Sequence, residues 1–275
     1  MAYRRGEQQM TKIRRSAAAL ALTVAAGAVV AAGSLSPANA ATQKYVALGD
    51  SYSSGDGAGS YGSSGACLRS ANAYPELYAK AHPGTALSFV ACAGAKVEDV
   101  LGKQVQALTA DTGLVTISIG GNDVGFASVV TTCTFGSDAA CTDRIAKSTA
   151  TATTALPGKL DTTYAEIKTR SPRAQVVVLG YPRLFASGPA FCAISQTKRT
   201  ALNKAADSLA EIIADRARSA GFTYEDVRDE FAGHGVCTSN PWIHGIRPLA
   251  VAESYHPTLA GQKNGYHAAL TNAIG

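Results

Sequence analysis

The sequence lacks several patterns that would assign it to common functional classes. It has no Cys-x-x-Cys pair, and His234 with Cys237 is a lone close pair without further ligands nearby, so we predict no metal site. It has no internal repeat and no long linker rich in Pro, Gly or Ser, which favours a single domain. It also has no basic stripe interleaved with aromatic residues, so a nucleic-acid partner is not expected.

A second long apolar run is also missing after the first 40 residues. The run at 16–33 follows five basic residues and precedes Ala38-Asn39-Ala40, a small-x-small cleavage site. This order is typical of a secretory signal peptide. We therefore predict a signal peptide at 1–40, cleavage near Ala40, and a secreted domain at 41–275 without a stable membrane anchor. Arg14-Arg15 suggests twin-arginine export, but small residues follow where bulky apolar ones are usual, so the export route stays open.

The charge of the whole chain is a property of that leader. The full sequence has 25 Lys and Arg against 20 Asp and Glu, a net charge of +5. The leader holds five of the basic residues and one acid, so the mature chain has 20 basic and 19 acidic residues and a net charge of +1. The basic balance of the precursor therefore says nothing about the partners of the mature protein.

All six cysteines lie in the part predicted to be exported. An even number in an oxidising compartment favours disulfides over thiol chemistry. The sequence alone permits about fifteen pairings. Cys133 and Cys141 would close a short polar loop as a local pair, and Cys67 with Cys92 and Cys192 with Cys237 would then staple longer loops.

Strand and helix patterns alternate along the mature chain. Apolar runs predict strands at 45–49, 86–91, 114–119, 175–180 and 222–227. A period of 3.6 residues predicts helices at 73–82, 97–108, 145–170 with a break near Pro157-Gly158, 195–220 and 259–274. Alternating strands and helices predict an α/β fold in which helices cover both faces of a parallel sheet.

Three of these strands end in small-residue motifs that carry polar side chains. They are Gly49-Asp50-Ser51, then Ala93-Gly94, then Gly120-Gly121-Asn122-Asp123. The carboxyl ends of parallel strands meet at one edge of the sheet, where such folds bind ligands. A further candidate, His256, lies in a loop before the last helix. The pattern thus predicts one site built from distant parts of the chain.

These residue types suit acyl transfer through a serine. We predict Ser51 as nucleophile, His256 as base, and an oxyanion hole formed by Asn122, Gly94 and the backbone N–H of Ser51. The plain alternative is that Ser, Asn and Gly serve as turn and cap residues. An imidazole base also needs a group that accepts its other N–H, and both Glu253 and the backbone carbonyl of Ser254 are candidates.

Taken together, the motifs resemble those of the SGNH (GDSL-type) hydrolases, especially the secreted bacterial lipases and phospholipases. The blocks that carry the resemblance occur in the family's order: Gly49-Asp50-Ser51-Tyr52-Ser53, Gly94, Gly120-Gly121-Asn122-Asp123 and Ser254-Tyr255-His256-Pro257. The resemblance implies a three-layer α/β/α sandwich with a flavodoxin-like, five-stranded parallel sheet. It implies the roles given above for Ser51, His256, Gly94 and Asn122. It also implies three disulfides, consistent with the sequential pairing.

One position departs from the family pattern. Most members have Asp three residues before the histidine, whereas this chain has Glu253. Some relatives resemble Ser–His dyads in which a main-chain carbonyl replaces the carboxylate, so we favour the Ser254 carbonyl and keep Glu253 as the alternative.

The predicted function is a secreted ester hydrolase, monomeric and without metal or organic cofactor. Lipid esters are the favoured substrates. Phospholipase A1 and carbohydrate (acetyl) esterase activities are alternatives on the same site. A catalytically silent secreted binding protein is the alternative from another class.

Overall fold

Five short strands form the sheet on which the site is built. The structure is a computed structural model, and it describes residues 43–188 and 190–274. The strands are β1 (Gln43–Gly49), β2 (Thr85–Phe89), β3 (Leu114–Ser118), β4 (Gln175–Leu179) and β5 (Thr223–Glu225). All neighbours pair in parallel, in the order β2-β1-β3-β4-β5. This flavodoxin-like order confirms the predicted fold. Successive strands are added on one side of β1 up to β2 and on its other side from β3 onward, so the strand order reverses between β1 and β3.

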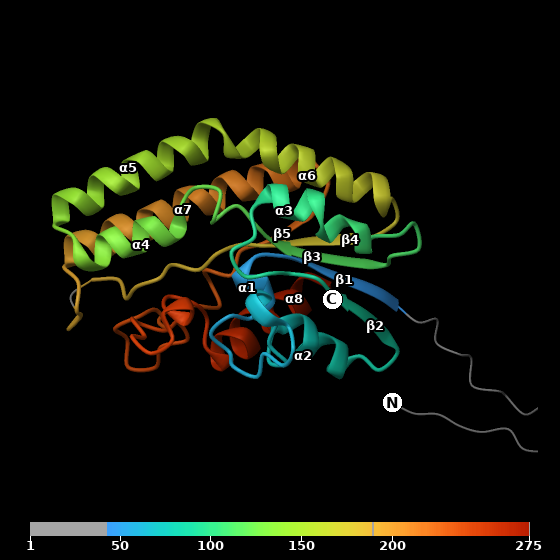
Figure 1. Cartoon of the computed structure of the whole chain (residues 1–275), viewed down its shortest axis with the longest axis horizontal. Helices are drawn as coiled ribbons and strands as arrows, with labels where there is room; N and C mark the ends of the chain where they lie inside the picture. The colour runs from blue at the N-terminus through green and yellow to red at the C-terminus, as the bar shows by residue number, and fades with distance from the viewer. Residues whose placement is uncertain (1–42, 189, 275) are drawn as a thin grey trace, which may run out of the picture. The chain divides into compact units, whose positions relative to one another are not determined.

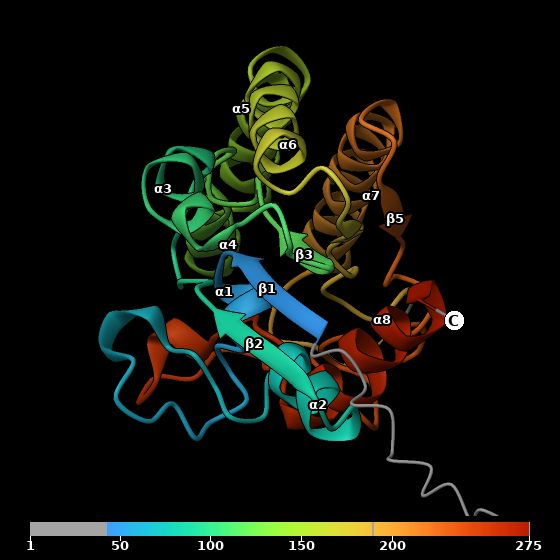
Figure 2. The same cartoon turned by 90° about the vertical axis from the view of Figure 1, so that its right-hand side faces the viewer.

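Helices cover the sheet from both sides (Figures 1 and 2). On one face lie α3 (Val97–Gly102), α4 (Phe126–Phe135), α5 (Asp138–Thr154), α6 (Leu156–Arg170) and α7 (Gln196–Ser219). On the other face lie α2 (Tyr74–Ala81) and α8 (His267–Ile274). The short α1 (Ser51–Ser54) directly follows β1. Because both faces are covered, β3 and β4 are almost continuous runs of buried residues.

Two helices differ from the sequence prediction. The segment predicted as one helix over 97–108 is α3 followed by a 3-10 turn, Gln104–Ala107, because the helix ends at Gly102, a weak helix former. Helix α4 was not predicted. Its sequence is rich in β-branched Val and Thr, which disfavour an isolated helix, and packing of Val129 and Cys133 stabilises it instead.

Other elements begin or end at different residues than predicted. The predicted break in the helix over 145–170 falls at Ala155, just before Pro157, which cannot donate a helical hydrogen bond. Strand β5 is only three residues long and lies at the sheet edge. The last predicted helix, 259–274, contains a π-helical turn, Gly261–Tyr266, before α8, and Gly265 packs closely against the ring of Phe231.

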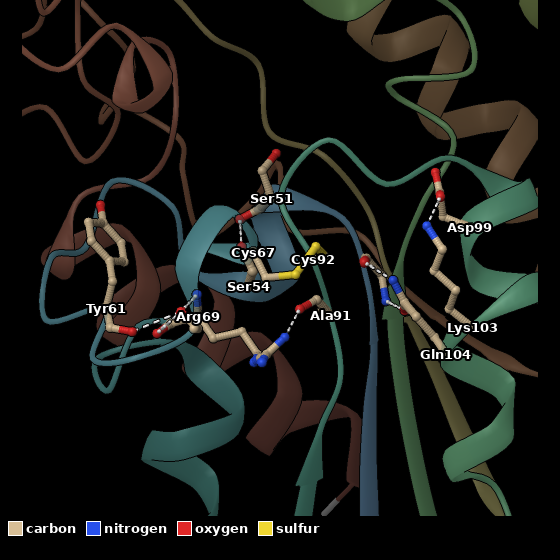
Figure 3. The surroundings of a disulfide bond; sticks show 12 residues. Ser51, Ser54, Tyr61, Cys67, Arg69, Ala91, Cys92, Asp99, Lys103 and Gln104 are labelled. Carbon is tan, nitrogen blue, oxygen red and sulfur yellow. Dashed lines mark hydrogen bonds and ion pairs between the residues drawn. A yellow bond between two sulfur atoms is a disulfide. The ribbon is translucent and has the colours of Figure 1, made fainter.

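The six cysteines pair in chain order. The bridges are Cys67–Cys92, Cys133–Cys141 and Cys192–Cys237. The sequence predicted that the second bridge would close a short polar loop. The bridge instead joins α4 to α5, because both cysteines lie in helical segments. The first bridge lies beside the end of β1 (Figure 3). There the N–H of Cys92 donates to the carbonyl of Gly49 at 3.0 Å.

The predicted leader, 1–40, lies outside the described residues. Among the helices that the structure does describe, none is long and apolar enough to cross a bilayer.

Candidate active site

Ser51 is held at the carboxyl edge of the sheet by the end of β1. Gly49 has φ of +122°, and a Cβ there would lie 2.5 Å from the carbonyl oxygen of Ser118, so only glycine fits. The side chain of Gln104 binds both backbone groups of Gly49, at 2.7 and 2.9 Å (Figure 3). Asp50 caps α1 by accepting from the N–H of Tyr52 at 3.0 Å. Ser51 is therefore the first residue of a helix, and hydrogen bonds fix the two residues that precede it.

The ring of His256 lies against this serine. Nε2 of His256 is 2.7 Å from Oγ of Ser51, although the two residues are 205 positions apart. Nδ1 lies 3.1 Å from the carbonyl oxygen of Ser254. Since a carbonyl only accepts, Nδ1 carries the proton, and Nε2 is left to accept from the hydroxyl of Ser51. This tautomer is the one that a base acting on Ser51 requires.

The loop that carries His256 is strained and tied down. Tyr255 has φ of +63°, a left-handed conformation that non-glycine residues adopt rarely. Its carbonyl accepts from the hydroxyl of Tyr52 at 2.8 Å, which links the residue after Ser51 to the residue before His256. On the other side, the carbonyl of His256 accepts from the N–H of His244 at 2.9 Å. These contacts hold the ring close to the serine.

Asn122 and Gly94 border the same space from the neighbouring loops. Nδ2 of Asn122 donates to the carbonyl of Ala95 at 3.1 Å, which orients the amide and leaves its second N–H available. Gly94 has φ of +77°, and a Cβ there would meet nothing within 4 Å. The backbone conformation, rather than crowding, thus favours glycine. The first N–H of α1, that of Ser51, has no partner within the helix.

Glu253 does not take the position that the sequence left open for it. Its carboxylate accepts from the hydroxyl of Tyr61 at 2.7 Å and pairs with the guanidinium of Arg247 at 3.1 Å. The Nδ1–H of His256 donates to the Ser254 carbonyl instead. A glutamate has one more methylene than the aspartate usual at this position, and here its carboxylate extends to Tyr61.

Comparison with known proteins identifies the chain. Residues 47–263, most of its length, match the GDSL-like lipase/acylhydrolase family. The chain belongs to this family. It is 50% identical to Lipase 1 of Streptomyces coelicolor over 92% of this chain and 95% of the relative, and 47% identical to a lipase of Streptomyces rimosus over 96% and 99%.

Two solved structures share the fold at high identity. An extracellular lipase from Streptomyces rimosus superposes with a TM-score of 0.82 at 49% identity, covering 84% of this chain and 99% of that one. A phospholipase A1 from Streptomyces albidoflavus superposes with a TM-score of 0.83 at 46% identity, covering 85% and 100%. The family assignment confirms the predicted class: this GDSL-like enzyme is a carboxylic-ester hydrolase with a lipase or esterase function.

The electrostatics of this hydrolase keep His256 neutral. Burial lowers the pKa of His256 to about 4, and its hydrogen bond to Ser254 offsets only part of this effect. At neutral pH the imidazole is therefore uncharged, and Nε2 has a lone pair to accept a proton.

The sequence did not reveal the residues that join the loop of Ser51 to the neighbouring loops of the site. The Tyr181 hydroxyl donates to Oδ2 of Asp50 at 2.5 Å and accepts from the N–H of Gly121 at 3.1 Å. It thus joins the loop of Ser51 to the loop of Asn122. Burial raises the pKa of Asp50 to about 7, and the hydrogen bond from Tyr181 works against this rise. Asp123 binds the N–H of Val97 at 3.1 Å and Lys159 at 3.2 Å, which fixes α3 beside the site.

Two hollows meet at Ser51, Asn122 and Phe126. The first, here called the narrow slot, has a volume of about 80 Å³ and runs between α4, α5 and α7 along Val129, Ala152, Leu202, Ala205 and Leu209. The second, here called the wide cleft, has a volume of about 750 Å³ and is lined by His256, Gly94, Asp56, Phe135, Ile246 and Val251, among others. Within residues 43–188 and 190–274, no three His, Cys, Asp or Glu side chains are grouped so that they could hold a metal ion.

Proposed function

We propose that this enzyme hydrolyses lipid esters through an acyl-enzyme formed on Ser51. The observation that carries the proposal is the contact of 2.7 Å between Nε2 of His256 and Oγ of Ser51, in the tautomer set by the Ser254 carbonyl. A serine hydroxyl becomes a useful nucleophile when an adjacent base can take its proton. A neutral, oriented imidazole meets that need, and the Ser254 carbonyl takes the part that a carboxylate plays in a triad.

The reaction follows in two halves. Oγ of Ser51 attacks the ester carbonyl while its proton passes to Nε2 of His256, and the carbonyl electron pair moves onto the oxygen. The oxyanion is stabilised by the N–H groups of Ser51 and Gly94 and by the amide of Asn122, each donor contributing about 3 kcal/mol. His256 then protonates the departing alkoxide. Water, deprotonated by His256, releases the acid from Ser51 and restores the enzyme.

The two hollows take different parts of the ester. Because His256 protonates the leaving alcohol, that group must lie on the side of the ring. His256 lines the wide cleft but not the narrow slot, whereas Ser51 lines both. The alcohol or headgroup therefore occupies the wide cleft, and the acyl chain enters the apolar slot between α5 and α7.

Exposed apolar side chains at the mouth of the wide cleft favour a lipid substrate. Phe135 and Val251 line the cleft and are 79% and 71% exposed, and Ile246 is 40% exposed. Large apolar side chains at a rim are costly in water unless they meet an apolar partner. A lipid ester presents such a partner next to its scissile bond.

Filling the slot is expected to shorten the preferred acyl chain. In Ala205→Phe the new ring occupies space beside Leu202 and Leu209. We expect kcat/KM for p-nitrophenyl decanoate to fall about tenfold or more relative to that for p-nitrophenyl acetate. One methylene that an apolar pocket cannot accommodate lowers kcat/KM by about tenfold or more. Ala146→Phe, at an exposed alanine of α5 that lines neither hollow, is the control. An unchanged chain-length profile in Ala205→Phe would contradict the slot assignment.

A substrate panel separates the remaining alternatives. The relative from Streptomyces albidoflavus is a phospholipase A1, so the panel pairs a phospholipid and a triacylglycerol with an acetylated xylan. We expect cleavage of the lipids and little release of acetate from xylan. We also propose that export removes residues 1–40 and that the mature enzyme is a monomer. Sequencing of the secreted N-terminus and light scattering check these two points.

A further inference from the structure

A second carboxylate lies beside His256. Asp56 follows α1, is only 2% exposed, and places Oδ2 3.9 Å from Nδ1 of His256. Among the described residues its other oxygen, Oδ1, is buried without a hydrogen-bond partner. A buried carboxylate with an unpartnered oxygen is costly, and such groups in native structures usually have a functional reason.

The loop around Asp56 is fixed against the histidine. The N–H of Gly57 donates to the hydroxyl of Tyr61 at 2.9 Å, and the carbonyl of Gly57 lies 2.8 Å from Nε2 of His244. A Cβ at Gly57 would lie 2.6 Å from the carbonyl oxygen of Pro257 and 3.1 Å from Cβ of His256. The backbone therefore packs directly on the loop of His256, and the carboxylate is held beside the ring.

We propose that Asp56 is a positioning residue whose negative charge stabilises the imidazolium that forms at His256. The inference rests on the proposed function of Ser51 and His256. When Oγ of Ser51 bonds to the ester carbon, its proton moves to Nε2 and the ring becomes positive. The Ser254 carbonyl keeps the Nδ1 proton, and Asp56 receives no proton; it supplies a full charge that a carbonyl lacks. Asp56 is neither of the two groups, Glu253 and the Ser254 carbonyl, that the sequence predicted as partners of His256.

The charge on Asp56 depends on pH. Burial, followed by the like charge of Glu253, raises the pKa of Asp56 to about 7, and the N–H of Gly57 lowers it. The other titratable groups around it are His256, His244, Tyr52 and Tyr61, and Arg247 acts on it through Glu253. Asp56 is therefore neutral below about pH 7 and negative above it.

This behaviour predicts how Asp56→Asn differs from the parent enzyme. In the parent, kcat/KM for a soluble p-nitrophenyl ester is expected to rise with a midpoint near pH 7, as Asp56 loses its proton. In Asp56→Asn that rise is absent, so the two enzymes differ by about fourfold or less near pH 5.5 and by about 10- to 100-fold above pH 8. The difference lies in kcat rather than in KM, since the charge acts on the transition state.

Glu253→Gln is the matched control. It removes the neighbouring carboxylate that raises the pKa of Asp56, so the rise in kcat/KM moves to lower pH but keeps its amplitude. At about pH 8 its activity is expected to fall less than that of Asp56→Asn, because Glu253 acts on His256 only through its charge and that charge is paired with Arg247.

Thermal stability separates this role from a structural one. The pKa of Asp56 is raised on folding, so its proton is lost from the unfolded chain near pH 3.8 but from the folded protein only near pH 7. Between these values stability falls as pH rises, because the folded state keeps a proton that the unfolded state has released. Asparagine does not titrate, so Tm of Asp56→Asn at pH 8 should equal or exceed that of the parent. A structural aspartate predicts a lower Tm.

The outcomes keep the two proposals apart. A pH-dependent loss in Asp56→Asn with an unchanged or raised Tm supports the inference. A profile in Asp56→Asn that parallels the parent at every pH overturns it, while loss of activity in Ser51→Ala leaves the proposed function standing. Full activity in Ser51→Ala would instead overturn the proposed function itself.

Discussion

Replacing Ser51 with alanine is expected to lower kcat for p-nitrophenyl butyrate by about 10⁵-fold or more, as loss of the nucleophile does in other serine hydrolases. The methyl group of alanine cannot form the acyl-enzyme, while the apolar hollows and the oxyanion donors remain. KM should therefore change little. The measurement is steady-state hydrolysis at saturating substrate, with the mature enzyme checked for an unchanged Tm.

Ser54→Ala provides the control for Ser51→Ala. Ser54 lies in the same short helix, and its hydroxyl donates to the carbonyl of Ser51 at 3.2 Å, so the change removes a nearby hydroxyl without touching the reacting atoms (Figure 3). We expect its activity to stay within about tenfold of the parent, since one neutral hydrogen bond contributes only about 1 kcal/mol. Comparable activity in Ser51→Ala and Ser54→Ala would contradict the assignment of the nucleophile.

Replacing His256 with glutamine is expected to lower kcat by about 10⁴- to 10⁶-fold, because glutamine cannot take the proton of Ser51 at neutral pH. The double variant Ser51→Ala with His256→Gln should be no slower than the slower single variant. Residues that act as one unit are not additive, since either loss alone removes the whole step. Kinetics of the two single variants and the double variant measure this directly.

His82→Gln is the matched control for the histidine. His82 stacks on Tyr78 with ring centroids 4.1 Å apart, outside both hollows. Its replacement should leave kcat unchanged. Losses that simply multiply in the Ser51 and His256 double variant would show that the two residues do not act together.

Much of the fold could be predicted because burial leaves a clear pattern. The runs that became β1, β3 and β4 are mostly apolar, as a sheet covered on both faces requires. Helix α4 could not be predicted, since its Val and Thr residues favour strands, and the helix is instead supported by tertiary contacts such as the disulfide to α5. Local preference fails where tertiary packing decides the structure.

Some residues of the candidate site could likewise be predicted from the sequence, and others could not. Ser51 and Asn122 follow strands that end in glycines, so their common edge could be inferred from order along the chain. Asp56 and Tyr181 gave no such signal, because their importance comes from burial and from partners in distant loops. The choice between Glu253 and the Ser254 carbonyl likewise depends on side-chain direction, which spacing alone does not determine.

The most direct test of the central claim is to treat the mature, folded enzyme with a fluorophosphonate and to locate the adduct by peptide mass spectrometry. A neutral His256 at 2.7 Å from the hydroxyl predicts rapid, complete and single modification at Ser51, which His256→Gln abolishes. An active enzyme that carries no adduct, or carries it on another residue, would contradict the account.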